Sequence, residues 1–213
     1  MENKTYSVSL EKNPLISIKV TPGHFTTGHF HTNYYLDVSG LKANALAARD
    51  VARELAVPYL SSTLIDTIVC IENTKVIGAY LAEELLQDGT AIMNSGGVIH
   101  VVTPKSSSDG KFIFYDNEAE WITNRNILLL TTTVSSGLTV NSALECLSYY
   151  RGIVAGISAL FLYSGAVPEL NIHTLFTSDD IPGYTAVDSS VCGMCKAGQK
   201  LDALISSEGY KII

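Results

Sequence analysis

A run of hydroxyl side chains in the middle of the chain has the composition of a phosphate-binding turn. Four aliphatic residues, 127–130, are followed by Thr131 and Thr132, and then by Ser135, Ser136, Gly137 and Thr139. Gly137 allows a tight backbone turn, and a helix that begins near Thr139 presents unpaired N–H groups and the positive end of its dipole. Together with the hydroxyls, these groups would bind a phosphate. The same residues also suit an ordinary turn and helix N-cap, and their spacing alone leaves both interpretations open.

Two further polar segments carry charged side chains. The short apolar run 66–71 is followed by Glu72, Asn73, Thr74 and Lys75. A longer polar excursion, residues 105–117, has Lys105 and Lys111 on either side of a Ser-Ser-Ser-Asp-Gly turn. These lysines would bind an anionic ligand, or they form the solvated tip of a hairpin. In the same way, Lys75 either faces an anion or is exposed at the start of a helix.

Aromatic side chains near the N-terminus offer flat surfaces for a planar ligand. Tyr34 and Tyr35 are adjacent, and Phe25 precedes them. A planar base could stack on such amphipathic rings. Considered alone, the tyrosine pair is better explained as core or interface packing.

Histidines and cysteines occur in two separate parts of the chain. His24, His29 and His31 alternate near the N-terminus, and Cys192 and Cys195 form a lone CxxC motif. No second CxxC or His-rich segment follows this motif, so it predicts a reverse turn of structural or incidental role, with half of a zinc site or a redox dithiol as alternatives. The histidines are typical of surface hydrogen bonding. We therefore expect no metal site.

Alternating helix and strand patterns predict an α/β fold around these segments. Amphipathic helices are expected at residues 43–55, 76–86 and 139–150, and strands at residues 66–71, 98–103, 126–130, 153–163 and 171–176. Continuous apolar strands between helices predict a mostly parallel, twisted sheet with helices on both faces. Ligands bind at the carboxyl ends of strands in such sheets, which is where the hydroxyl-rich turn lies.

Composition restricts the class of protein. The chain has 213 residues, 46% of them hydrophobic, which predicts a single domain. Within this domain we expect an α/β core at 42–176, an N-terminal segment at 1–41 and a C-terminal extension at 177–213 that contains the CxxC. The net charge of −7 argues against nucleic acid as a partner. No apolar stretch is long enough to span a membrane, the first residues do not form a signal peptide, and the cysteine usage fits a reducing cytoplasm.

Residues 127–139 resemble the signature of the type I phosphoribosyltransferases. That signature is a hydrophobic strand, two acidic residues and a Thr/Ser–Thr/Ser–Gly–x–Thr loop that binds the 5-phosphate of phosphoribosyl pyrophosphate. Ser135, Ser136, Gly137 and Thr139 match the loop, whereas Thr131 and Thr132 stand at the positions of the two acids. Residues 68–78 resemble the pyrophosphate-binding loop of the same family.

Residues 23–37 resemble the base-binding segment of orotate phosphoribosyltransferases. The matching positions are Phe25, Gly28, Tyr34, Tyr35 and, one residue out of register, Asp37, while Thr26 stands where a lysine is expected. The resemblance extends in order over about residues 23–163. It implies the phosphoribosyltransferase fold with a small N-terminal hood that holds the two tyrosines.

The resemblance implies an enzyme, a glycosyltransferase that transfers phosphoribosyl from phosphoribosyl pyrophosphate to orotate or another base in pyrimidine nucleotide synthesis. It also implies Mg²⁺ carried by the pyrophosphate, a homodimer, and a mobile catalytic loop that contains Lys105 and Lys111. In this reading Glu72, Asn73, Thr74 and Lys75 hold pyrophosphate. Threonines at positions 131 and 132 can hydrogen-bond the ribose but bring no charge, which implies reduced activity. The alternative is a non-catalytic protein that binds a nucleotide monophosphate or ribose phosphate on the same fold.

Overall fold

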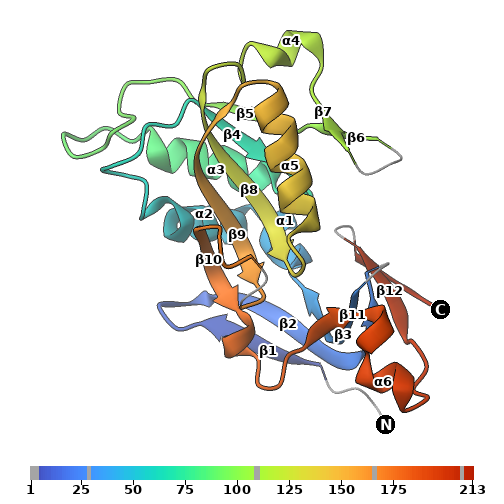
Figure 1. Ribbon diagram of the computed structural model, residues 1–213. Coiled ribbons are helices and arrows are strands. Elements are labelled where there is room, and N and C mark those ends of the chain that lie inside the picture. The colour runs from blue at the N-terminus through green and yellow to red at the C-terminus, as the bar shows by residue number, and fades with distance from the viewer. Residues whose placement is uncertain (1–4, 28–29, 108–110, 165–166, 207–208) are drawn as a thin grey trace.

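A computed structural model describes residues 5–27, 30–107, 111–164, 167–206 and 209–213. Its centre is a five-stranded sheet in which every neighbouring pair is parallel. The strands, in spatial order, are β10 (Ile172–Thr177), β9 (Ile153–Leu162), β8 (Asn126–Val134), β4 (Thr67–Cys70) and β5 (His100–Val102). The predicted mostly parallel α/β sheet is thus confirmed (Figure 1).

Both faces of this sheet are buried, because alternate residues of the central strands β4 and β8 enter different hydrophobic clusters. In β4, Ile68 and Cys70 pack in one cluster with the helices α2 (Ala45–Ala56) and α3 (Lys75–Leu85). Val69 packs in the other cluster with α5 (Leu138–Tyr149). Side chains of a strand point alternately to its two faces, so a sheet covered on both faces requires continuous apolar runs. These are the runs that predicted the strands.

The strand order places one crevice at the centre of the sheet. If the five strands are numbered 1 to 5 in chain order, starting from β4, their spatial order is 2-1-3-4-5. The chain therefore leaves β4 toward one edge of the sheet and leaves β8 toward the other edge. Ligands in open α/β sheets bind at such a switch point, outside the carboxyl ends of the strands. Those ends are followed by Glu72 and by the hydroxyl-rich turn.

Strand β8 is longer than the sequence pattern predicts. The apolar run ends at Leu130, but the strand continues through the three threonines to Val134. Thr133 and Val134 still pair with Phe161 and Leu162 of β9. Threonine is β-branched and fits a pleated strand, so the change from apolar to hydroxyl side chains does not end the pairing.

A second sheet forms the hood, and it includes strands from both ends of the chain. It contains β1 (Tyr6–Leu10), β2 (Asn13–Thr26), β3 (Phe30–Asp37), β11 (Ala186–Asp188), β12 (Ala203–Ser206) and β13 (Gly209–Ile212). β11 pairs with β3 and β12 pairs with β2, so the C-terminal extension completes the hood that residues 1–41 were expected to form. Pairing of this kind covers the open edges of the two long hood strands.

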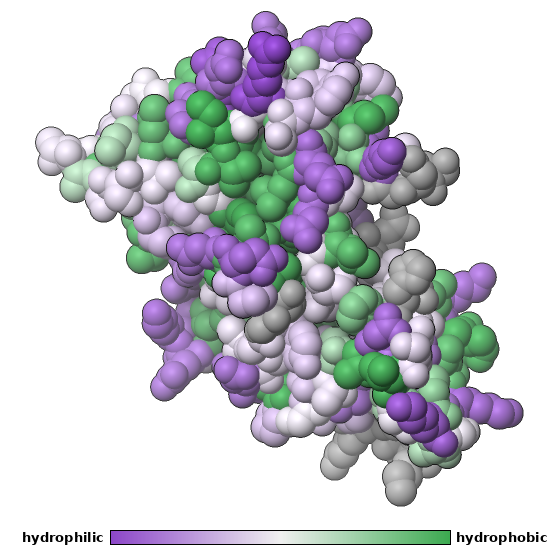
Figure 2. All heavy atoms as spheres, viewed as in Figure 1, coloured by the Kyte–Doolittle hydropathy of each residue, from purple (hydrophilic) through white to green (hydrophobic). Residues whose placement is uncertain are grey.

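The remaining short elements lie in the segments between the strands of the two sheets. They are α1 (Ser39–Ala43), the two-stranded hairpin of β6 (Lys105–Ser106) and β7 (Phe112–Ile113), α4 (Asp116–Ala119), the 3₁₀ helices η1 (Ser178–Asp180) and η2 (Ser189–Val191), and α6 (Gly193–Lys196). Figure 2 shows hydrophilic side chains gathered over α4, which buries none of its residues. None of the helices in the described part of the chain is long and apolar enough to cross a membrane.

Candidate functional site

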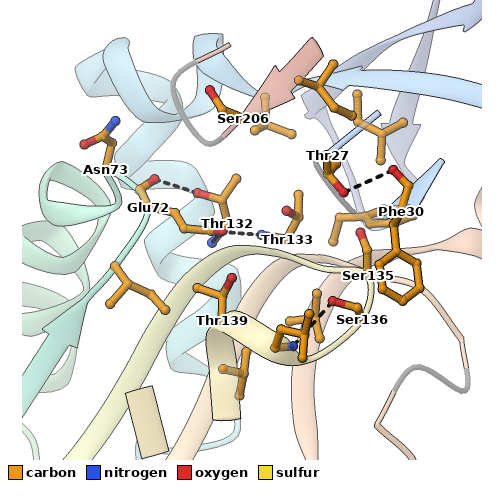
Figure 3. A pocket seen from close by; sticks show the side chains of 18 of the residues that line it. Thr27, Phe30, Glu72, Asn73, Thr132, Thr133, Ser135, Ser136, Thr139 and Ser206 are labelled. Carbon is orange, nitrogen blue, oxygen red and sulfur yellow. Dashed lines mark hydrogen bonds between the residues drawn. The ribbon is translucent and has the colours of Figure 1, made fainter. Parts of the chain in front are cut away.

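A cavity of about 1090 Å³ lies between the carboxyl ends of the central strands and the hood. The turn after β8 forms one side of it, and Ser135, Ser136, Gly137 and Thr139 all line it (Figure 3). Gly137 is the N-cap of α5 with φ of 77°. A Cβ atom at this position would lie 2.2 Å from Val167 Cγ1, so the turn depends on glycine for both conformation and space. The predicted cradle residues therefore lie together at the start of a helix of 12 residues.

Glu72 brings a carboxylate to the end of β8. Its Oε2 atom accepts hydrogen bonds from Thr131 Oγ1 at 2.9 Å, Thr132 N at 3.0 Å and Thr133 N at 3.1 Å. Glu72 and Asn73 have positive φ values of 54° and 63°, and this left-handed turn directs the side chain from the end of β4 toward β8. A negative charge thus lies at the strand end where the sequence shows only threonines.

Thr131 and Thr132 are buried, with 0% and 2% of their surface exposed. Thr131 donates its hydroxyl to the Glu72 carboxylate, and Thr132 donates its hydroxyl to the Glu72 carbonyl at 2.8 Å. Thr132 lines the cavity, and Thr131 is not among its lining residues. Both hydroxyl protons are thus donated to Glu72, and the predicted contact of the two threonines with a ribose stays a prediction.

Lys42 is a cation at the cavity that sequence analysis missed. It lies on α1 and is half-buried, and its Nζ donates to the Glu72 carbonyl at 3.2 Å and to Thr132 Oγ1 at 3.5 Å. Burial lowers the pKa of Lys42, while the nearby charges of Glu72 and Asp37 act in the opposite direction. Among the described residues that line the cavity, Lys42 and Glu72 are the only charged ones.

Aromatic side chains form the hood side of the cavity. Tyr34 and Tyr35 line it as expected, and Tyr184, from the C-terminal extension, lines it with them. The rings of Tyr34 and Tyr184 are stacked, with centroids 6.2 Å apart and planes inclined by 11°. Phe25 is 5% exposed and lies behind Tyr35, with ring centroids 6.1 Å apart, rather than on the cavity wall. Phe25 therefore supports the wall and Tyr184 extends it.

The other predicted site residues have different positions. Asn73 lines the cavity, whereas Thr74 is buried and its hydroxyl donates to the carbonyls of Ile71 and Leu130. Lys75 is exposed at the start of α3 and does not line the cavity. Thr74 thus links the turn to β8 by hydrogen bonds, and the predicted contact of Lys75 with pyrophosphate stays a prediction.

The polar excursion forms a hairpin at the edge of the cavity. Ser106 and Phe112 of this hairpin line the cavity, while Lys105 and Lys111 are exposed and do not. Residues 108–110 of this excursion, like Gly28 and His29 of the N-terminal segment, lie outside the described residues. The roles of both lysines stay predictions.

The amino-acid sequence matches no protein-family model and no curated protein. The structure is similar to that of an adenine phosphoribosyltransferase from Thermoanaerobacter pseudethanolicus, with a TM-score of 0.50 and 15% identity over 68% of this chain and 88% of that one. It is also similar to UMP synthase of Leishmania donovani, with a TM-score of 0.54 and 20% identity over 74% of this chain and 33% of that longer one. The chain therefore has the fold of the type I phosphoribosyltransferases.

Proposed function

We propose that this protein transfers the phosphoribosyl group of phosphoribosyl pyrophosphate to a pyrimidine base, orotate, and releases pyrophosphate. The observation that supports it best is the position of the Glu72 carboxylate. It lies at the switch point of the sheet, in one cavity with a phosphate-binding type of turn and an aromatic wall. A phosphate, a ribose and a planar base joined in that order would meet these three features in sequence.

The 5-phosphate is assigned to the turn before α5. Ser135, Ser136 and Thr139 supply hydroxyl donors there, and the first N–H groups of the helix have no partner within the helix. The positive end of the helix dipole favours an anion at this place. The compact backbone at Gly137 lets that anion approach closely.

Glu72 is assigned to the ribose. In the reaction the bond from the anomeric carbon to a pyrophosphate oxygen breaks, and the electron pair leaves with pyrophosphate. A bond then forms from that carbon to a ring nitrogen of the base, which loses its N–H proton to the departing pyrophosphate or to water and uses the freed electron pair. The carbon carries positive charge between these events, and a fixed carboxylate stabilises such charge without having to reorganise. The hydrogen bonds from Thr132 and Thr133 hold Glu72 in place for this role.

The leaving pyrophosphate is assigned to Asn73 and Lys42, beside Glu72. The ammonium group of Lys42 reduces the negative charge that develops on the leaving oxygen. Mg²⁺ would arrive bound to the pyrophosphate, since this ion is typically held by substrate phosphates and one or two carboxylates, and Glu72 is available as one. The metal would neutralise phosphate charge.

The base is assigned to the hood. Tyr34, Tyr35 and Tyr184 give a flat, partly apolar wall on which a planar ring can stack. Orotate is chosen because residues 23–37 resemble the base-binding segment of orotate phosphoribosyltransferases. We further propose that the protein is a homodimer, which light scattering on the purified chain would test.

The test is a product assay with several bases. Purified protein is incubated with phosphoribosyl pyrophosphate, Mg²⁺ and orotate, uracil or adenine, and products are separated by chromatography. Orotidine monophosphate formed from orotate alone supports the proposal. A nucleotide formed from adenine instead would support phosphoribosyl transfer as the reaction and would overturn the assignment of orotate as the base. Tight binding of phosphoribosyl pyrophosphate, measured by calorimetry, with no product from any base would overturn the enzymatic proposal in favour of a binding protein.

A further inference from the structure

Four metal-ligating side chains meet in the hood, away from the cavity. They are His24 of β2, His31 of β3, Cys192 at the N-cap of α6 and Cys195 within α6. One ligand atom from each lies within 4.8 Å of the other three. His24, His31 and Cys192 are buried, and Cys195 is exposed. The two motifs that sequence analysis treated as unrelated thus form one cluster.

The distances within the cluster are close to those around a single tetrahedral ion: two lie within the expected range, and two are shorter by about 0.1–0.3 Å. His24 Nε2 lies 3.0 Å from His31 Nδ1, 3.5 Å from Cys192 Sγ and 3.6 Å from Cys195 Sγ, and Cys195 Sγ lies 3.2 Å from His31 Nδ1. A tetrahedral Zn²⁺, with bonds of about 2.3 Å to sulfur and about 2.0–2.1 Å to nitrogen, places its ligand atoms roughly 3.3–3.8 Å apart. A two-iron cluster would instead hold the two thiolates on one iron and the two imidazoles on the other. Here Cys195 Sγ lies within 3.6 Å of both imidazoles, as expected for ligands of one ion.

The surroundings of His24 orient it as a ligand. Its Nδ1 lies 3.0 Å from the Gln199 carbonyl oxygen, so this nitrogen carries the proton and Nε2, on the cluster side, is left with its lone pair. The Asp202 carboxylate accepts a hydrogen bond of 2.7 Å from the His24 backbone N–H. A hydrogen-bonded partner on the second ring nitrogen is the usual arrangement for a metal-bound histidine.

We propose that His24, His31, Cys192 and Cys195 bind one Zn²⁺ ion as a structural centre. Two thiolates and two imidazoles are a typical ligand set for structural zinc, and four protein ligands leave no open position for catalysis. Each thiol loses its proton when the ion binds. Zinc binding here does not depend on which ligand the cavity holds.

The ion would fasten the C-terminal extension to the β2–β3 hairpin. After Cys195, the chain reaches Asp202, which contacts His24, and then enters β12, where Ile205 and Ser206 line the cavity. The metal would therefore be bound just before β12, the strand that forms part of one wall of the cavity. Its removal should loosen that wall while the turn before α5 stays intact.

The first test is the metal content of the full chain, purified under reducing conditions and measured by mass spectrometry of the elements. We expect one zinc ion per chain and almost complete loss in the Cys192→Ser and Cys195→Ser variants. Cys146→Ser serves as the matched control, because Cys146 is a buried cysteine of α5 outside the cluster. Zinc that is retained in the double variant Cys192→Ser/Cys195→Ser would overturn the proposal.

The second test uses wild-type protein and does not depend on whether the variants fold. The metal is removed with a chelator, and the protein is titrated with Co²⁺. A thiolate-to-cobalt absorption band that saturates at one equivalent and disappears on addition of Zn²⁺ is expected, together with a lower melting temperature of the metal-free protein. Absence of that band in protein with titratable, reduced thiols would show that the cluster is only a hydrogen-bonded network, and would overturn the proposal.

Discussion

Replacing Glu72 by glutamine tests the site most directly, because it removes the charge and keeps the shape. The glutamine oxygen can still accept hydrogen bonds from Thr131, Thr132 and Thr133, which lie 2.9–3.1 Å from the carboxylate oxygen. If the reacting carbon is positively charged beside this group, kcat should fall by about 10²–10³-fold, the usual cost of losing one fixed electrostatic partner. The affinity for inorganic phosphate should change little, because the hydroxyl-rich turn before α5 is untouched.

The same substitution has a measurable effect on stability. A hydrogen bond to a charged group contributes about 1.5–3 kcal/mol and a neutral one about 0.5–1.5 kcal/mol. Glu72 is half-buried and its bonds are not additive, so we expect the free energy of unfolding to fall by about 1–2 kcal/mol in total. For a chain of this length that is a decrease of about 2–8 °C in melting temperature. Glu72→Ala should be worse, because it leaves the N–H groups of Thr132 and Thr133 without their acceptor.

Steady-state kinetics and thermal unfolding check both effects, with Glu83→Gln on the exposed surface of α3 as the matched control. The control should behave as wild type in both measurements. A Glu72→Gln protein with wild-type kcat would refute the role of this carboxylate in the reaction. An alanine variant as stable as the glutamine variant would refute the stability argument, since the carboxylate would then not be holding the end of β8.

Three further predictions concern the turn, the cation and the aromatic wall. Gly137→Ala should lower the free energy of unfolding by about 1 kcal/mol or more, because of its φ of 77° and the close approach of Val167, and should also weaken binding of ribose 5-phosphate in calorimetry. The larger Gly137→Val should distort the turn itself as well as obstruct the ligand. Burial lowers the pKa of Lys42 from 10.5, so this lysine loses its charge at a lower pH than a free lysine does. Pyrophosphate affinity should therefore decline as the pH is raised toward 10.5. The Lys42→Arg variant, which stays charged, should show no such decline. Equal pH profiles for the two proteins would contradict the placement of Lys42 beside the pyrophosphate. Tyr184→Leu should raise the KM for the base roughly 2–13-fold through loss of stacking, worth roughly 0.5–1.5 kcal/mol beyond area burial, and leave the KM for phosphoribosyl pyrophosphate unchanged. An effect on both substrates would place Tyr184 elsewhere in the reaction.

Thr131 and Thr132 stand where the phosphoribosyltransferase signature has two acids, and the double variant Thr131→Glu/Thr132→Asp places acids at these positions. Both threonines are buried, however, and both contact Glu72. New carboxylates there would be desolvated beside an existing one, which is costly. We expect the double variant to be destabilised and not to gain activity, as a thermal unfolding measurement would show.

Local patterns in the sequence determined the core of this protein. Continuous apolar runs predicted strands buried on both faces, and amphipathic spacing predicted helices 45–56, 75–85 and 138–149 to within a few residues. The turn with Ser135, Ser136 and Gly137 was also visible, because its residues are contiguous and their chemistry depends on neighbours in the chain. Patterns of this kind report which side chains must be buried and where the backbone must turn.

Only the tertiary structure decided which separated residues share a site. Glu72 reaches Thr131 across 59 positions, Lys42 reaches Thr132 across 90, and Cys192 meets His24 across 168. Nothing in the periodicity around these residues indicates such partners, because a side chain at a strand end or hairpin serves any ligand that folding brings to it. The strand order of the central sheet and the pairing of the C-terminal strands with the hood bring them together. Sequence patterns thus determined the elements of the central sheet and the hydroxyl-rich turn, whereas long-range strand pairing determined the charge at the site and the cysteine–histidine cluster.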